Sequence, residues 1–332
     1  MFRLLGAPVP PPATFDACHG CDVCALSCPV WQQTRDMRLT PKGRAKAIQG
    51  GAGAEDLVES LSACLMCGSC VPACPERIDL VGMTLTLRAD LARAGRSPLA
   101  PLTEGLAVPP ALSARPAVAG KTVLLAEPRL LADLPALSSA ILRLGGPSHV
   151  VVPDDTGADI AWSIEAGLTP DPARIAGFLE SLSGALRVIL CEGFLIGFLR
   201  ERLPGTPIRG IGEACLAVPA VREALRTSDY YVLDTRAYHA DRERLVRVYD
   251  TLRRETGCAL NLDLQRLAIP TGARAVPSRH GAGPVRVQEQ VRWMLEGWHP
   301  RRIVVENLED GEAMRAHTGL PVVHVAGVGT SG

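Results

Sequence analysis

The chain has 332 residues, a length that suggests two or three domains of about 150 residues each. Its 35 basic and 35 acidic side chains give a formal net charge of zero, so no long-range field favours nucleic acid or an anionic membrane. No stretch reaches the roughly 18 to 20 apolar residues of a membrane span, and the apolar run at the start is too short for a signal peptide. We therefore expect a soluble, cytoplasmic protein that binds no nucleic acid and reaches a membrane only through a partner.

Eight of the eleven cysteines form two runs of identical spacing near the N-terminus. In chain order these runs are Cys18, Cys21, Cys24 and Cys28, and then Cys64, Cys67, Cys70 and Cys74. Pro29 follows the first run and Pro75 the second, which completes the C-x2-C-x2-C-x3-C-P pattern of bacterial ferredoxins. Three thiolates two residues apart can each bond a different iron of one cube, and the proline then redirects the chain.

In two-cluster ferredoxins, the fourth cysteine of each run binds the cluster of the other run. This precedent predicts two [4Fe–4S] clusters, one on Cys18, Cys21, Cys24 and Cys74 and the other on Cys64, Cys67, Cys70 and Cys28. Structural zinc usually needs only two cysteine pairs around one tetrahedron, so half of the pattern would be superfluous for it. Disulfides need an oxidising compartment, for which no export signal is evident. We therefore favour iron–sulfur clusters over zinc and disulfides.

The residues around the two runs have helical patterns. Thr40 followed by Pro41 is typical of an N-cap and a first helical position. Leucines spaced by four residues predict a helix over 54–65, and Asp79 is placed to cap another one. These patterns predict an α-helical two-cluster module over 14–95, followed by a Pro-rich linker over 96–118.

From residue 119 onward, apolar strand patterns alternate with helical ones. Strands are expected at 121–126, 149–152, 187–190, 230–233, 302–305 and 322–325. Helices are expected at 134–144, 173–182, 194–203, 241–256, 285–298 and 308–317. Such alternation predicts βαβ units with parallel sheets. Because 187–203 and 302–317 share the order strand, acidic turn, helix, we expect two similar α/β units, at 119–228 and 229–332.

The two cysteine runs, together with Pro41-Lys-Gly-Arg44 between them, resemble a known family. They are similar to the iron–sulfur subunits of glycolate oxidase, lactate-utilisation and anaerobic glycerol-3-phosphate dehydrogenase systems, and to the ferredoxin-type subunit of heterodisulfide reductase. The resemblance implies a helical two-cluster ferredoxin joined to two cysteine-rich α/β domains. In that family, a Cys-Cys-Gly motif and a late Cys-Pro-x-Cys motif mark those domains and hold a further cluster or reduce disulfides.

The second half of this chain departs from the family pattern. It holds only Cys191, Cys215 and Cys258, which are isolated from one another. The positions expected for the late cysteines read Cys191-Glu-Gly in the first unit and Glu306-Asn-Leu-Glu-Asp310 in the second. We interpret both units as degenerate cysteine-rich domains that retain the fold without its cluster, and we assign the three thiols to the core.

The favoured function is a non-catalytic electron-transfer subunit of an oxidoreductase complex. Its clusters would take single electrons from a flavin-containing dehydrogenase or an electron-transfer flavoprotein and pass them to a quinone reductase, another Fe–S protein or a terminal reductase. The alternative is a catalytic reductase subunit with a substrate site in the α/β half, which an accessible thiol of depressed pKa would support. A third hypothesis is an assembly scaffold with structural clusters.

Overall fold

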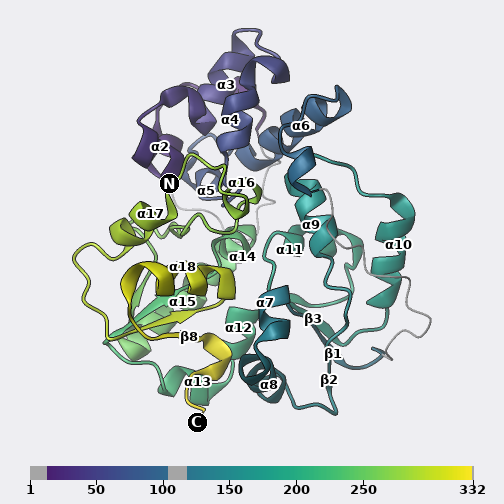
Figure 1. The fold of residues 1–332 in the computed structure, drawn as a ribbon, viewed down its shortest axis with the longest axis vertical. Coiled ribbons are helices and arrows are strands. Elements are labelled where there is room, and N and C mark those ends of the chain that lie inside the picture. The colour runs from purple at the N-terminus through teal and green to yellow at the C-terminus, as the bar shows by residue number, and fades with distance from the viewer. Residues whose placement is uncertain (1–12, 104–117, 331–332) are drawn as a thin grey trace, which may run out of the picture.

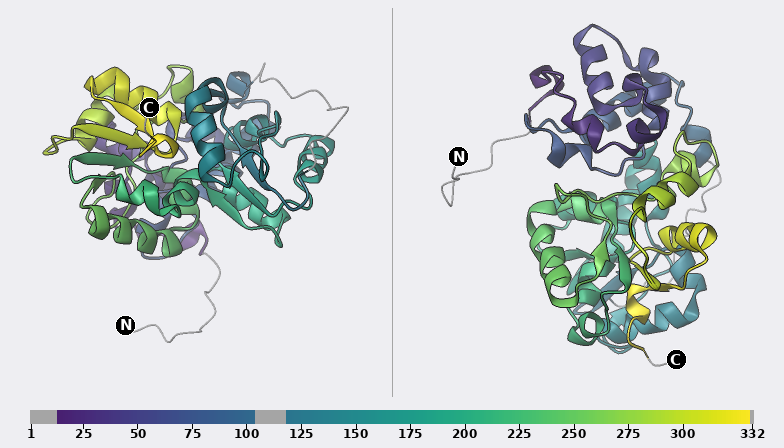
Figure 2. Two further views of the ribbon diagram at one scale, coloured as in Figure 1. Left: turned by 90° about the horizontal axis from the view of Figure 1, so that it is seen from below. Right: turned by 90° about the vertical axis from the view of Figure 1, so that its left-hand side faces the viewer.

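The computed structural model describes residues 13–103 and 118–330. An N-terminal helical module sits above two α/β units that lie side by side (Figure 1), and Figure 2 shows the module resting on the ends of both units. Within the described residues, no helix has the length and apolar composition needed to cross a bilayer.

The module is built from six short α-helices. They are α1 Val23–Leu26, α2 Pro29–Thr34, α3 Pro41–Gln49, α4 Val58–Ala63, α5 Cys70–Ala73 and α6 Leu80–Arg93. Both predicted caps are present, because the Thr40 side chain accepts from the Gly43 N–H and the Asp79 side chain accepts from the Gly82 N–H. The helix expected at 54–65 is divided into a 3-10 turn, Ala54–Leu57, and α4.

The first α/β unit has a four-stranded parallel sheet in the order β2-β1-β3-β4. Its strands are β1 Thr122–Leu125, β2 Val150–Val151, β3 Arg187–Leu190 and β4 Ile208–Gly210. Its helices are α7 Pro128–Ala132, α8 Leu134–Arg143, α9 Ala158–Glu165, α10 Pro172–Ser181, α11 Leu195–Arg202, α12 Ile211–Leu216 and α13 Pro219–Glu223.

The second unit repeats this topology, since its parallel sheet has the order β6-β5-β7-β8. Its strands are β5 Asp229–Val232, β6 Ala259–Leu260, β7 Arg302–Val305 and β8 Val322–His324. Its helices are α14 Thr235–Ala240, α15 Arg242–Thr256, α16 Val276–Arg279, α17 Val287–Met294 and α18 Leu308–Thr318. The expectation of two similar parallel units is thus confirmed at the level of strand order.

The two sheets share one core. Alternate residues of the central strands point to opposite faces, so Leu124 and Ile189 of the first sheet join the same buried cluster as Tyr231 and Val304 of the second. The outer face of each sheet has its own smaller cluster. Strands buried on both faces explain why each central strand has three consecutive apolar residues after its first, polar residue.

The Pro-rich linker expected at 96–118 falls mostly outside the described residues. The described part at its start contains one short 3-10 turn, Ala100–Thr103. The module and domain limits proposed from the sequence remain predictions.

Candidate iron–sulfur site

The two cysteine runs adopt the same backbone conformation. In each run, the residues just before and just after the second cysteine have positive φ: Gly20 at 82° and Asp22 at 68°, then Met66 at 52° and Gly68 at 83°. Asp22 and Met66 are not glycines, and such residues seldom adopt this region unless the surroundings require it. Two left-handed residues in three wrap each loop around a small volume, into which its cysteines can project.

Cysteines from both runs line the first of two small cavities. Its lining contains Cys18, Cys21 and Cys24 from the first run and Cys74 from the end of the second. Burial, followed by the neighbouring thiols of Cys74, Cys18 and Cys21, raises the pKa of Cys24 to about 11. A cationic iron cluster bound here would stabilise the Cys24 thiolate and so offset the cost of its burial.

The second cavity has the reciprocal composition. Cys64, Cys67 and Cys70 of the second run line it together with Cys28 of the first. Burial raises the pKa of Cys28 to about 12, and the nearby thiols of Cys67 and Cys64 contribute to this increase. Burial and the thiols of Cys64, Cys67 and Cys28 raise the pKa of Cys70 well above its ordinary value. The structure therefore brings the eight predicted cysteines together in the two groups of four that the crossed pattern requires.

The fourth cysteine of each run reaches the other group because the chain turns there. Cys28 is extended, with ψ of 116°, and Pro29 after it opens α2. Cys74 is likewise extended, with ψ of 117°, and Pro75 follows it. A proline after each cysteine restricts the preceding residue to extended conformations, which carries the thiol across to the facing loop.

Buried arginines surround the second group. Arg44 and Arg88 are each 1% exposed, and Arg236 is 6% exposed. Arg44 donates to the Ser60 carbonyl at 3.0 Å, and Arg88 donates to the Cys64 carbonyl at 2.7 Å. The charge of Arg44 favours the thiolate forms of Cys28 and Cys70, and that of Arg236 favours the thiolate of Cys67. The second group is thus set in positive surroundings.

Arg88 and Arg236 were not identified from the sequence. Arg88 falls on the buried face of α6 with Leu80, Thr84, Leu87 and Leu91, so a charge within an apolar helical stripe was the available signal. The sequence around Arg236 contains no such signal, because the residues that pair with Arg236 lie on distant segments of the chain.

A histidine joins the second group to the α/β half. His239 of α14 donates from Nδ1 to the Cys67 carbonyl at 2.8 Å, and its Nε2 accepts from the Ala268 N–H at 3.2 Å. Burial lowers the pKa of His239 to about 4, so the ring is neutral at physiological pH. Gly68 permits this close approach, since a Cβ there would lie 2.8 Å from the His239 Cβ.

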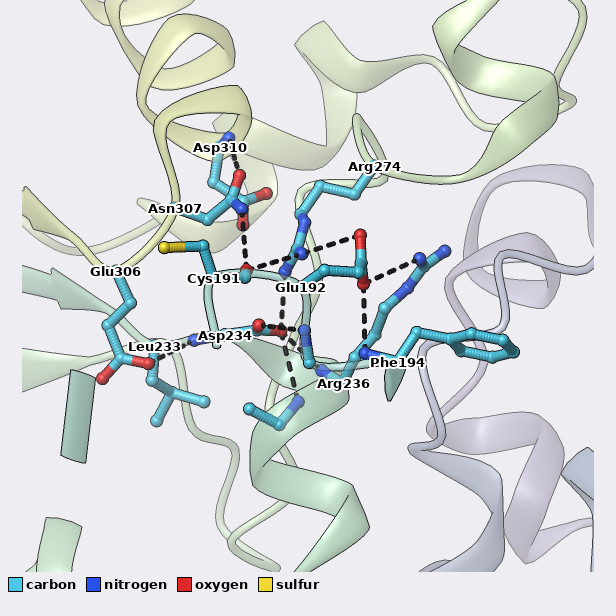
Figure 3. Close-up of polar contacts among 12 residues, drawn as sticks. Cys191, Glu192, Phe194, Leu233, Asp234, Arg236, Arg274, Glu306, Asn307 and Asp310 are labelled. Carbon is cyan, nitrogen blue, oxygen red and sulfur yellow. Dashed lines mark hydrogen bonds and ion pairs between the residues drawn. The ribbon is translucent and has the colours of Figure 1, made fainter. Parts of the chain in front are cut away.

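A network that we call the polar seam lies where the carboxyl ends of the two sheets meet, and Figure 3 shows part of it. Its members are Glu127, Glu165, Glu192, Asp234, Arg236, Arg274 and Glu306. Arg274 pairs with Asp234 at 2.7 Å and with Glu192 at 3.2 Å, which joins the second unit to the first. Arg236 pairs with Glu165 at 2.8 Å and also donates to the Leu65 carbonyl at 3.2 Å. The seam therefore extends from the shared edge of the sheets to the second cysteine group.

The carboxyl groups of the polar seam have pKa values shifted in opposite directions. Burial raises the pKa of Glu127 to about 8 and that of Glu306 to about 7. Burial would also raise the pKa of Glu192, but the guanidiniums of Arg274, Arg236 and Arg279 hold it well below its usual range. Protonated and ionised carboxyls thus coexist at neutral pH.

The seam occupies the positions where the resemblance places late cysteines. Cys191 and Glu192 follow β3, Glu306 and Asn307 follow β7, and the two turns face each other in Figure 3. The Asn307 amide donates to the Cys191 carbonyl at 3.3 Å. This hydrogen bond joins the two turns directly, and Arg279 bridges them through ion pairs with Glu192 and Glu309.

Cys191, Cys215 and Cys258 belong to no metal-binding cluster of His, Cys, Asp or Glu side chains among the described residues. Each is buried, with 1%, 0% and 1% exposure, respectively. Burial raises all three thiol pKa values, to about 12 for Cys215. Their surroundings match the core role expected from the sequence.

Comparison with known families identifies a 4Fe-4S dicluster domain over residues 14–78. No curated protein sequence and no solved structure matches the chain significantly. The module thus contains a domain of the type that binds 4Fe-4S clusters, and the range includes all eight cysteines of the two runs.

The side chains present fit such a cofactor. Across residues 13–103 and 118–330, no three His, Cys, Asp or Glu side chains converge tightly enough to hold a single metal ion. A [4Fe–4S] cluster has a different requirement, because each thiolate bonds its own iron around the cube. Two cavities, each lined by four cysteines, meet this requirement.

Proposed function

We propose that this protein carries single electrons through two [4Fe–4S] clusters. Cys18, Cys21, Cys24 and Cys74 hold the first cluster, and Cys64, Cys67, Cys70 and Cys28 hold the second. The observation that supports this most strongly is the exchange of the fourth cysteine between the two groups. The exchange ties the clusters to one fold, and each bound cluster supplies a one-electron redox couple.

The donor in this proposal is a flavin-containing dehydrogenase or an electron-transfer flavoprotein. A flavin takes two electrons from a substrate, whereas each cluster accepts one, so a two-cluster protein is suited to divide the pair. The acceptor is a quinone, another Fe–S protein or a reductase. The α/β half is the platform on which the second cluster is held, through Arg236 and His239.

The catalytic alternative lacks the reactive thiol that it would use. Cys191, Cys215 and Cys258 are buried and their pKa values are raised, which disfavours the nucleophilic thiolate. We therefore keep electron transfer as the single proposed function.

Anaerobic iron and sulfide analysis, combined with a redox titration followed by EPR, tests the proposal. We expect about eight irons and eight sulfides per chain and two interacting reduced [4Fe–4S] signals. About four irons in anaerobically handled protein would contradict the two-cluster assignment. Iron that persists after replacement of all eight N-terminal cysteines would show that the α/β half holds a centre instead. Clusters that cannot be reduced or oxidised would contradict the electron-transfer function.

A further inference from the structure

A cavity of about 350 Å³ opens beside the second cysteine group. Four parts of the chain form its wall: the second cysteine run with α6, the end of α9, the segment 193–202 that contains α11, and α14. It differs from the two cysteine-lined cavities because only one of the eight cysteines, Cys67, contributes to it. Its volume falls at the lower end of the range for small-molecule sites, about 300 to 1,000 Å³.

The walls of the cavity are largely apolar. Val81 and Leu85 of α6 face it from the module, while Ile164, Phe194 and Phe198 face it from the first α/β unit. Two aromatic rings among aliphatic side chains favour a flat, ring-shaped ligand.

The charged groups at the cavity are already paired. The Arg202 guanidinium lies 4.1 Å from the Phe198 ring centroid and pairs with Glu201 at 3.1 Å. Arg236 lies 5.4 Å from the Phe194 ring centroid and pairs with Glu165 at 2.8 Å. With their charges balanced, these arginines have little capacity to neutralise a phosphate or carboxylate. Their remaining N–H groups can still donate to a neutral carbonyl oxygen.

We propose that this cavity binds a quinone and that the quinone exchanges electrons with the second cluster. The inference rests on the proposed function, because that cluster supplies the electrons. A quinone is planar and neutral, and its two carbonyl oxygens accept hydrogen bonds. Reduction takes two electrons, delivered singly through the cluster, and two protons from solvent at the open mouth of the cavity. The product is the hydroquinone, and both electrons originate from the donor protein.

Gly197 provides a way to block the cavity without disturbing its surroundings. It lies in α11, lines the cavity, and would have no heavy atom within 4 Å of an added Cβ. Gly197→Leu should therefore place its side chain in the cavity. Gly177→Leu is the matched control, since Gly177 is also helical and also faces open space, but on α10 away from the cavity.

The test uses the full chain with its clusters and menadione, a naphthoquinone without a prenyl tail, as the probe. Calorimetry with the oxidised protein measures binding separately from electron transfer. We expect Gly197→Leu to weaken menadione binding at least about tenfold and Gly177→Leu to leave it unchanged. Stopped-flow reoxidation of the reduced clusters by menadione should slow in parallel. Flavin mononucleotide, whose phosphate is charged, should bind at least about tenfold more weakly than menadione.

Leu85→Trp fills the same cavity from the opposite wall and replaces Gly197→Leu if that variant does not fold. Absence of menadione binding, or equal binding by the wild type and a folded cavity-filled variant, would overturn the proposal. If the clusters are present and redox-active in that case, the proposed function stands and only the quinone site fails. If the wild type lacks redox-active clusters, both the proposed function and the electron exchange fail.

Discussion

The two cysteine groups have the same local geometry in opposite surroundings. Both loops have left-handed residues on either side of the second cysteine, and both end in an extended cysteine before a proline. The first group lies at the outer part of the module, where Cys21 is exposed and the His19 side chain is 76% exposed. The second group lies against the α/β half, and the buried side chains of Arg44, Arg88 and Arg236 surround it.

This difference shows that two copies of one cysteine motif can place two clusters in different electrostatic surroundings. Reduction adds negative charge to a cluster, and nearby buried positive charge stabilises that charge. At the first group, Lys42 is the cation comparable to these arginines. Its ammonium group is already paired with the Asp22 carboxylate at 2.6 Å. We therefore expect the second cluster to have the higher reduction potential. Electrons would then move from the first cluster to the second, toward the cavity beside Cys67.

The largest expected effect is the loss of a whole cluster, which tests how the two groups divide the ligands. We expect Cys74→Ser to give the EPR spectrum of Cys21→Ser, and Cys28→Ser to give that of Cys67→Ser. The reason is that Cys74 lines the first cavity and Cys28 the second. Each variant should retain about four irons per chain. If the EPR spectrum of Cys28→Ser instead matched that of Cys21→Ser, Cys28 would bind the cluster of its own run. That result would refute the crossed ligation.

A smaller effect is expected on the pH dependence of folding stability, because the polar seam beside the second cysteine group contains protonated carboxyls. Glu306 accepts from the Tyr231 hydroxyl at 2.7 Å, the Tyr249 hydroxyl at 2.6 Å and the Asp234 N–H at 2.8 Å. Burial raises its folded-state pKa to about 7 from an ordinary 4.5. The folded state therefore binds more protons than the unfolded state between these values, so stability falls as pH rises through this range. The slope is at most about 1.4 kcal/mol per pH unit for one carboxyl.

Thermal unfolding under anaerobic conditions measures this effect. We expect the wild-type Tm to be lower at pH 8 than at pH 6.5, because Glu306 ionises and Glu127, with a pKa of about 8, begins to do so. Glu306→Gln should reduce the difference, whereas Glu296→Gln at an exposed position should not. A wild-type Tm that rises over this interval would refute the assignment of protonated carboxyls to the seam.

The sequence was informative where local chemistry decides the outcome. Strands 187–190 and 302–305 were predicted with the bounds that the structure has, since each is an arginine followed by three consecutive apolar residues. The cap at Thr40 was also local and is present. The cysteine spacing predicted two groups of four because the ferredoxin pattern includes the geometry of the fourth ligand.

The surroundings of the second group could not be predicted in the same way. Arg236 is paired with Glu165 and reaches Leu65, so its burial depends on segments far away in the chain. In the sequence, such an arginine is indistinguishable from a surface residue. Edge strands β4, Ile208–Gly210, and β6, Ala259–Leu260, were missed because neither is a continuous run of β-branched residues. Features that arise from contact between the module and the units required the structure.

The smallest expected effect is on potential, and it tests the comparison most directly. Arg44→Gln removes a buried charge that acts on Cys28 and Cys70, whereas Lys42→Gln removes a paired charge near Cys18 and Cys24. We expect Arg44→Gln to lower the potential of the second cluster by about 60 mV, the one-electron equivalent of about 1.4 kcal/mol. Lys42→Gln should shift the first cluster less, because Asp22 and solvent already balance its charge. EPR-monitored titration of both variants, with iron content as the folding control, measures the two shifts. Equal shifts, or a larger one for Lys42→Gln, would mean that the buried arginines do not set the potential of the second cluster.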